Sequence, residues 1–145
     1  MRRRTVTDAA GRRYLLLKQS KSSSLVRDPE TGERLHLPTE ELDVLEDVAT
    51  TDTVLRGVPD AIVSLVTAVH DERTLALLVE LEHEGPMSVR TLLSAYDFCE
   101  SDLHGLLAEL TVAGLIEETT VFGERGYETT ELASEALEFL ILTEL

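Results

Sequence analysis

The sequence predicts an α+β fold, in which a small N-terminal antiparallel β-meander precedes a mainly helical part that contains one further hairpin. Over residues 13–37, short apolar stretches alternate with turn-forming sequences, a pattern typical of antiparallel strands. From residue 71 onward, leucines recur at the three- and four-residue spacing of amphipathic helices. These patterns divide the chain into a basic arm with the β-meander (1–38), connecting helices (39–70) and a C-terminal domain (71–145).

The first elements follow from local signals. Residues 1–11 are Arg-rich and lack periodicity, so we expect them to be frayed. Three strands are predicted at Tyr14–Lys18, Leu25–Arg27 and Arg34–Leu37, the last two separated by a loop containing Pro29 and Gly32. Thr39 is expected to cap a helix that runs to about residue 49, and Pro59 to begin a second helix that runs to residue 70. The second helix is apolar enough to join the two halves or to form a dimer surface.

The C-terminal elements are predicted by caps and leucine spacing. Helices are expected over about 72–84, 88–96 and 100–113, with Ser88 capping the second and Gly114 ending the third. Residues 115–122 and 127–130 form a hairpin around a turn at 123–126, which puts Arg125 at its tip. A last helix is expected over 131–144, capped by Thr130.

The composition is strongly acidic and poor in lysine. The 145 residues include 28 Asp and Glu against 13 Lys and Arg, which gives a formal net charge of -15. Carboxylates keep a protein hydrated while concentrated salt screens their repulsion, so this composition favours a halophilic prokaryote. The charge is uneven, because residues 1–34 hold nine Lys and Arg against four Asp and Glu, and residues 35–145 hold four against 24.

Several function classes are disfavoured. No apolar run approaches the roughly 20 residues that cross a bilayer, and no apolar stretch follows the basic start as in a secretory signal. We therefore expect a cytoplasmic protein without membrane contact. Cys99 is the single cysteine, and the four histidines lack metal-ligand spacing, so no metal or other cofactor is expected. Catalytic triad order and phosphate-binding glycine loops are absent, and we expect no enzyme.

Two stretches carry a resemblance to a known family. Residues 103–118, LHGLLAELTVAGLIEE, resemble the third helix and following strand of winged helix-turn-helix transcription regulators of the MarR, PadR and ArsR types, in a haloarchaeal form. Residues 127–140, YETTELASEALEFL, resemble the return strand of the wing and the helix after it. The resemblance implies a winged helix-turn-helix domain over 71–145, double-stranded DNA as partner and a homodimer.

The resemblance also implies a set of DNA-contacting residues. In this family the third helix enters the major groove and the wing touches a phosphate or the minor groove. On the third helix the residues that would face DNA are Ser101, Asp102, His104, Gly105 and Ala108. Arg90 and Arg125 would meet phosphates from the second helix and the wing. The N-terminal arginines Arg2, Arg3 and Arg4, with Arg12 and Arg13 behind them, are either a second contact on the DNA backbone or solvated charge.

The third helix departs from the family in its charge. It contains no Lys or Arg, and Glu100, Asp102 and Glu109 would face the phosphates. Cys99 stands where the family has a capping Ser or Thr, and we expect it to be buried and inert. Two hypotheses follow. The first is a DNA-binding transcription regulator. The second is a winged-helix protein–protein interaction module that binds no DNA and docks either a basic partner or a component of a larger complex.

Overall fold

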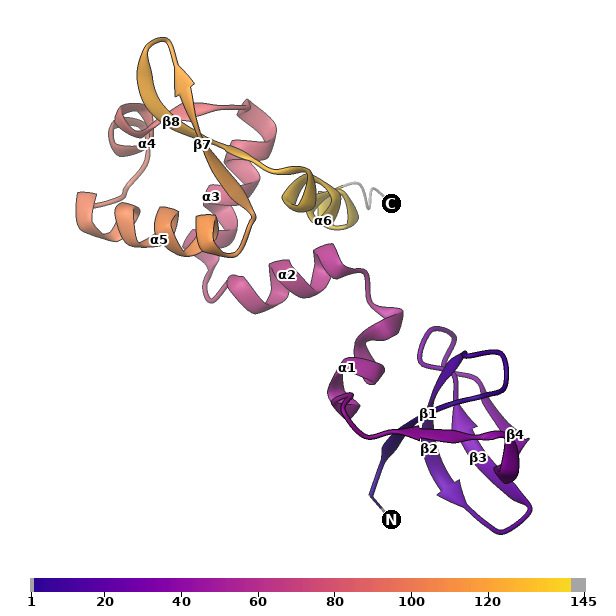
Figure 1. Ribbon diagram of the computed structural model, residues 1–145. Coiled ribbons are helices and arrows are strands. Elements are labelled where there is room, and N and C mark those ends of the chain that lie inside the picture. The colour runs from indigo at the N-terminus through magenta and orange to yellow at the C-terminus, as the bar shows by residue number, and fades with distance from the viewer. Residues whose placement is uncertain (1, 142–145) are drawn as a thin grey trace. The chain divides into compact units, whose positions relative to one another are not determined.

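The computed structural model describes residues 2–141 and divides the chain into two compact units between Pro59 and Asp60 (Figure 1). Both units combine helices and strands, so the predicted α+β class and the N-terminal antiparallel sheet are confirmed. The predicted connecting stretch 39–70 is shared between the units, because its first part packs on the sheet and its last helix belongs to the C-terminal unit.

The N-terminal unit is built on a five-stranded antiparallel sheet with the order β4-β3-β2-β1-β5. Its elements are β1 (Arg4–Thr7), β2 (Arg13–Gln19), β3 (Ser23–Arg27), β4 (Arg34–Pro38), η1 (Thr39–Glu41), β5 (Asp43–Leu45), α1 (Thr50–Val54) and η2 (Leu55–Gly57). The first four strands form a meander, and β5 returns to pair with β1. The three strands predicted over 13–37 are therefore confirmed.

Both faces of the central strands are buried. Val6, Tyr14, Leu16 and Val26 form the core on one face. Leu15 and Leu17 are also buried, and α1 packs on β1 and β2. Thr53 of α1 is fully buried and shares a hydrogen bond with Thr5 of β1. A register shift between Leu16 and Lys18 marks an irregularity in β2, and such bulges increase the bend of a strand.

Two predictions for this unit are wrong. The helix expected over 39–49 is absent, since this stretch forms η1 and β5. Residues 1–11, which the sequence analysis expects to be frayed, contain β1. This strand pairs with β2, beginning with Arg4 opposite Leu16. In both cases a strand pairing between distant segments overrides the local pattern, since β5 supplies the hydrogen bonds that the edge of β1 requires.

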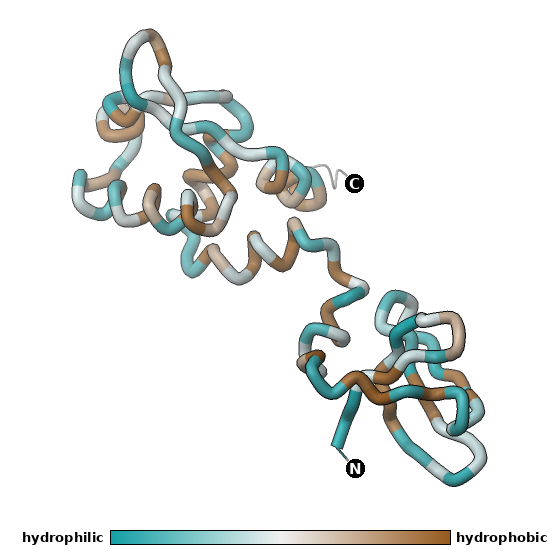
Figure 2. Tube along the Cα trace, viewed as in Figure 1, coloured by the Kyte–Doolittle hydropathy of each residue, from teal (hydrophilic) through white to brown (hydrophobic). Residues whose placement is uncertain are grey.

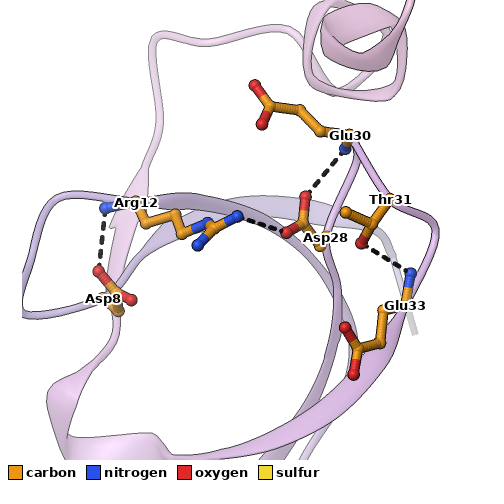
Figure 3. A network of polar contacts seen from close by, with 6 residues as sticks. All are labelled: Asp8, Arg12, Asp28, Glu30, Thr31 and Glu33. Atoms are coloured by element: carbon orange, nitrogen blue, oxygen red, sulfur yellow. Dashed lines mark hydrogen bonds and ion pairs between the residues drawn. The ribbon is translucent and has the colours of Figure 1, made fainter.

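A polar network joins two loops of the N-terminal unit (Figure 3). Asp8 accepts a hydrogen bond from the Arg12 backbone N–H at 2.9 Å. The buried Asp28 carboxylate accepts one from Arg12 Nη2 at 2.9 Å and another from the Glu30 backbone N–H at 2.9 Å. Thr31 Oγ1 accepts a longer one from the backbone N–H of Glu33, at 3.2 Å. Asp28 thus holds the β3–β4 loop and the guanidinium of the β1–β2 loop together.

Replacing Asp28 is expected to weaken this unit. Asp28→Ala removes two hydrogen bonds of a buried carboxylate, one of them to a cation, and should lower the free energy of unfolding by about 2–3 kcal/mol. Glu33→Ala, which removes an exposed carboxylate from the same loop, should change it by less than about 0.5 kcal/mol. Urea unfolding followed by two-dimensional NMR at amides of β2 measures both values. Equal effects of the two substitutions would contradict the role given to Asp28.

The C-terminal unit contains five helices and a three-stranded antiparallel sheet with the order β6-β8-β7 within the described residues. Its elements are α2 (Asp60–Ala68), α3 (Glu72–Glu84), β6 (Met87–Ser88), α4 (Val89–Ala95), α5 (Glu100–Val112), β7 (Ile116–Val121), β8 (Glu124–Thr129) and α6 (Glu131–Ile141). The helices predicted from residue 59 onward are confirmed to within one or two residues at their starts. Residues 142–144 of the predicted last helix lie outside the described residues.

The leucines of this unit form one core, and side-chain caps fix the helix starts. Its large fully buried members come from α3, α4, α5, the residue before β7, the first residue of β7 and α6, namely Leu78, Leu81, Leu92, Leu103, Leu107, Leu110, Leu115, Ile116 and Leu137. Ser88 Oγ accepts a hydrogen bond from the Thr91 backbone N–H at 3.1 Å, as the sequence predicts. Thr130 Oγ1 accepts one from the Ala133 backbone N–H at 3.3 Å, also as predicted. The core therefore holds α5 by its inner face and leaves its outer face in solvent.

Candidate nucleic-acid interface

The outer face of α5 is exposed and carries small side chains at its centre. Leu103, Leu107 and Leu110 point into the core. Ser101, Gly105 and Ala108 follow one another at spacings of four and three residues on the opposite, exposed side. A Cβ atom at Gly105 would meet no heavy atom within 4 Å. A partner can therefore approach the α5 backbone closely at this point.

Carboxylates and one histidine surround this small-residue centre. Asp102, His104 and Glu109 are exposed, as the sequence analysis expects of residues that face a partner. His104 Nε2 lies 3.8 Å from Glu100 Oε1, one turn earlier on the helix. Asp102 Oδ2 lies 3.8 Å from Arg73 Nη1 of α3. One carboxylate of α5, that of Asp102, is thus close to a cation from another helix.

Arg73 is a residue that the sequence analysis missed. Its guanidinium carbon lies 5.0 Å from the centre of the Phe98 ring, and its Nη2 donates to the Asp97 carbonyl oxygen at 2.9 Å. These contacts connect the start of α3 to the turn between α4 and α5. No signal in the sequence marks them, because Arg73 and Phe98 are far apart along the chain and meet only in the folded unit.

The hairpin of β7 and β8 turns at a different place from the prediction. Phe122 and Gly123 lie between the two strands, so they form the tip that the sequence analysis placed at 123–126. Arg125 is therefore wrongly placed at the tip, since it lies within β8 opposite Thr120. The prediction treats both glycines as turn residues. In the structure only Gly123, at φ +81°, forms the turn, and Gly126 is buried against β6.

Arg125 makes several contacts within the hairpin. Its Nη2 donates to the Tyr127 hydroxyl at 2.7 Å, and its Nε lies 2.9 Å from Glu118 Oε1. The guanidinium carbon also lies 5.6 Å from the centre of the Tyr127 ring. The hydrogen bond with Tyr127 first, and the charge of Glu118 to a smaller degree, raise the pKa of Arg125 above its ordinary value. These contacts hold the cation close to the sheet.

Arg90 lies at the start of α4 and reaches the hairpin. Its Nε is 3.4 Å from Glu124 Oε1, and its side chain is 83% exposed. Exposed ion pairs of this kind contribute about 0–1 kcal/mol, so an incoming anion can replace the carboxylate at small cost. Arg90 is therefore available to a phosphate.

The C-terminal unit holds few basic residues. The basic residues of 60–145 are Arg73, Arg90 and Arg125, against 18 Asp and Glu. Residues 1–59 contain ten Lys and Arg and ten Asp and Glu. The formal net charge of -15 thus belongs entirely to the C-terminal unit. Each of its three arginines contacts α5 or the hairpin.

The N-terminal arginines belong to the other unit. Arg4 lies in β1, and Arg3 Nη1 donates to the Leu17 carbonyl oxygen at 2.6 Å. Arg2, Arg3 and Arg4 line a groove of about 440 Å³, which residues 44–50, including Glu46 and Asp47, also line. The expected basic arm is therefore shorter than predicted, because Arg4 is part of the sheet.

Cys99 precedes α5 without capping it. The prediction that Cys99 is buried is wrong, since the thiol is exposed and its Sγ lies 3.6 Å from Ser101 Oγ. The leucines that bury α5 begin at Leu103, so the N-cap position that Cys99 occupies stays in solvent. No side-chain hydrogen bond closes this N-terminus, in contrast to the Ser88 cap of α4.

The two units and this α5–hairpin face define an α+β protein of two parts, and both parts fall within one family. Residues 3–141 match a family of unknown function, DUF7346, and the chain belongs to that family. No curated protein matches the chain, and neither does any solved structure. Between residues 2 and 141 there is no group of three or more His, Cys, Asp or Glu side chains arranged to hold a metal ion. None of the described helices has the length and apolar character to cross a membrane.

Proposed function

We propose that residues 71–145 form a winged helix-turn-helix domain and that the protein is a DNA-binding transcription regulator of a halophilic prokaryote. The observation that carries the proposal is the exposed helix α5, followed directly by the β7–β8 hairpin and flanked by all three arginines of the unit. In winged helix domains the corresponding helix occupies the major groove and the hairpin contacts the adjacent backbone or minor groove. The protein acts in the cytoplasm, where its DNA target lies.

The small number of cations fits binding in concentrated salt. The logarithm of a DNA-binding constant falls by about 0.9 per phosphate contact for each tenfold rise in salt. Three arginine contacts therefore cost about 10³ in affinity per tenfold rise, whereas eight would cost about 10⁷. The affinity that remains comes from base edges, for which Ser101 and His104 supply hydrogen-bonding groups. Gly105 and Ala108 let the helix backbone approach those edges.

A homodimer follows from the same proposal. The helices α2 and α6 pack on one another, and Val66 of α2 and Leu140 of α6 are 68% and 54% exposed. A second copy that covers these side chains would form a two-fold dimer, and dimers of this class of regulator read two half-sites about one helical turn apart. This arrangement gives a palindromic operator.

The charge of α5 favours a second candidate function, a protein–protein interaction module without direct DNA binding. Glu100, Asp102 and Glu109 are exposed on α5, and Val112 of the same helix is 90% exposed. A basic partner protein with an apolar contact would match this face, whereas phosphates would meet three carboxylates.

Neutralising one carboxylate of α5 distinguishes the two candidate functions, because it should strengthen DNA binding but weaken the binding of a basic protein. Glu109→Gln removes a repulsion toward phosphates, so it should raise DNA affinity about two- to fivefold at the lowest KCl concentration at which the chain remains folded. A basic protein partner would instead bind this variant more weakly. Fluorescence anisotropy with duplexes selected from a random library measures the change.

The matched control is Glu135→Gln, which neutralises an exposed carboxylate on α6 and should leave DNA affinity unchanged within about 1.5-fold. Failure of the wild-type chain to retain any duplex from the library would overturn the DNA proposal and leave the protein-interaction module. A loss of DNA affinity in Glu109→Gln would contradict the placement of α5 against DNA.

A further inference from the structure

The tip of the β7–β8 hairpin carries an aromatic residue in an unusual backbone conformation. Phe122 has φ +49° and is the only non-glycine residue with positive φ among those the structure describes. Gly123 follows at φ +81°. Two successive central residues with positive φ are the mark of a type I′ turn, in which Asn or Asp followed by Gly is strongly preferred. A phenylalanine at the first position is therefore a departure from what the turn requires.

The rest of the described chain gives no compensation for this conformation. The Phe122 side chain is 101% exposed, so its ring is not packed on the hairpin or on a helix. Figure 2 shows the hydrophobic colour at this protruding tip, followed by the hydrophilic colour at the start of β8. A bulky residue in the left-handed region is a backbone outlier, and such outliers are concentrated at functional sites. The turn would be more stable with asparagine, and the ring would gain from burial.

The surroundings of the tip identify the partner that fits it. Glu124, two residues after Phe122, contacts Arg90, and Arg125 follows in the same strand. The tip is thus followed directly by the strand that carries Arg125 and the carboxylate partner of Arg90. Salt screens phosphate contacts but not the stacking or burial of an aromatic ring, so a stacked ring supplies affinity that three arginines cannot supply in concentrated salt.

We propose that Phe122 inserts into a base step of duplex DNA from the minor groove while α5 lies in the major groove. Apolar side chains that enter the minor groove partly unstack a base step and kink the duplex toward the major groove. This inference rests on the proposed function, because it requires that the α5–hairpin face binds DNA. It adds an anchor residue and a deformation of the DNA to that function.

Two substitutions at one position test the insertion. Phe122→Asn restores the residue that the turn prefers, so it should raise the melting temperature by a few degrees yet weaken DNA binding about 10- to 100-fold. Phe122→Trp keeps a stacking ring and should bind within about threefold of the wild type. Thr120→Ala, at an exposed residue of the same hairpin, is the matched control and should bind unchanged.

The readout is made on a selected duplex that carries 2-aminopurine at successive positions. Unstacking by the wild-type chain and by Phe122→Trp should raise the fluorescence at one step, whereas Phe122→Asn should leave it unchanged. Wild-type affinity in Phe122→Asn would overturn the insertion and leave the proposed function standing. A lower melting temperature in Phe122→Asn would overturn it too, because the ring would then stabilise the hairpin itself. Absence of DNA binding by the wild type would overturn both proposals.

Discussion

Gly126→Val is expected to lower the free energy of unfolding of the C-terminal unit by at least about 3 kcal/mol. A Cβ atom at Gly126 would lie 2.6 Å from the Met87 carbonyl oxygen and 2.8 Å from Val121 Cγ2. The first neighbour is backbone of β6, which pairs with β8 at this residue, so the strand itself has to move. The movement would separate β6 from the sheet that carries the hairpin.

A second glycine provides the control for this prediction. Gly105→Ala lies within α5, where an added Cβ meets no atom within 4 Å. Alanine is a better helix former than glycine, so this variant should be more stable by about 0.5–1 kcal/mol. Urea unfolding in concentrated KCl, followed by NMR at amides of α5, measures both variants. Unchanged stability of Gly126→Val would contradict the packing of β6 against β8.

The variant Arg90→Glu with Arg125→Glu should bind DNA about 100-fold more weakly than the wild type. Each reversal removes an attraction to phosphates and adds a repulsion, and two such sites together account for about 3 kcal/mol. The slope of the logarithm of the binding constant against the logarithm of KCl concentration should also become shallower by about 1.8. Anisotropy titrations of one selected duplex at several KCl concentrations give both quantities.

The control for these reversals changes the same amount of charge elsewhere. Arg34→Glu with Arg56→Glu alters two exposed arginines of the N-terminal unit and should change the affinity by less than about threefold. Circular dichroism of the first variant establishes that the loss of the Arg125–Tyr127 contact leaves the unit folded. An equal loss of affinity in both variants would show that net charge matters and the position of the arginines does not.

The parts of the fold that depend on neighbours in sequence are predictable from the sequence. Helix α5 follows from the spacing of Leu103, Leu107 and Leu110, and the starts of α4 and α6 follow from Ser88 and Thr130. These signals act within a few residues, so the chain order alone contains them.

The parts that depend on distant pairing are not predictable in this way. The strand Asp43–Leu45 has the apolar residues of a helix face, but its hydrogen bonds to β1 decide its conformation. Two glycines of the hairpin serve different needs, since Gly123 has a positive φ and Gly126 lies close to β6. The sequence alone does not show which glycine forms the turn. The prediction therefore has Arg125 at the tip, where the structure has Phe122.

The candidate site shows the same division. The outward residues of α5, among them Ser101, His104 and Ala108, are predicted because helical periodicity separates an inner from an outer face. Arg73 is missed because its contacts with Phe98 and Asp102 join segments 25 and 29 residues away. The carboxylate partners of Arg90 and Arg125 are likewise known only from the folded hairpin.

Photo-crosslinking from the outer face of α5 tests the central claim most directly. A benzophenone amino acid is placed at Ala108, which is exposed on α5, and in a second variant at Glu135, which is exposed on α6. With a selected duplex in concentrated KCl, we expect a covalent DNA adduct from position 108 and none from position 135. Adducts from position 135 alone, or none from position 108 while the DNA is bound, would contradict the placement of α5 against DNA.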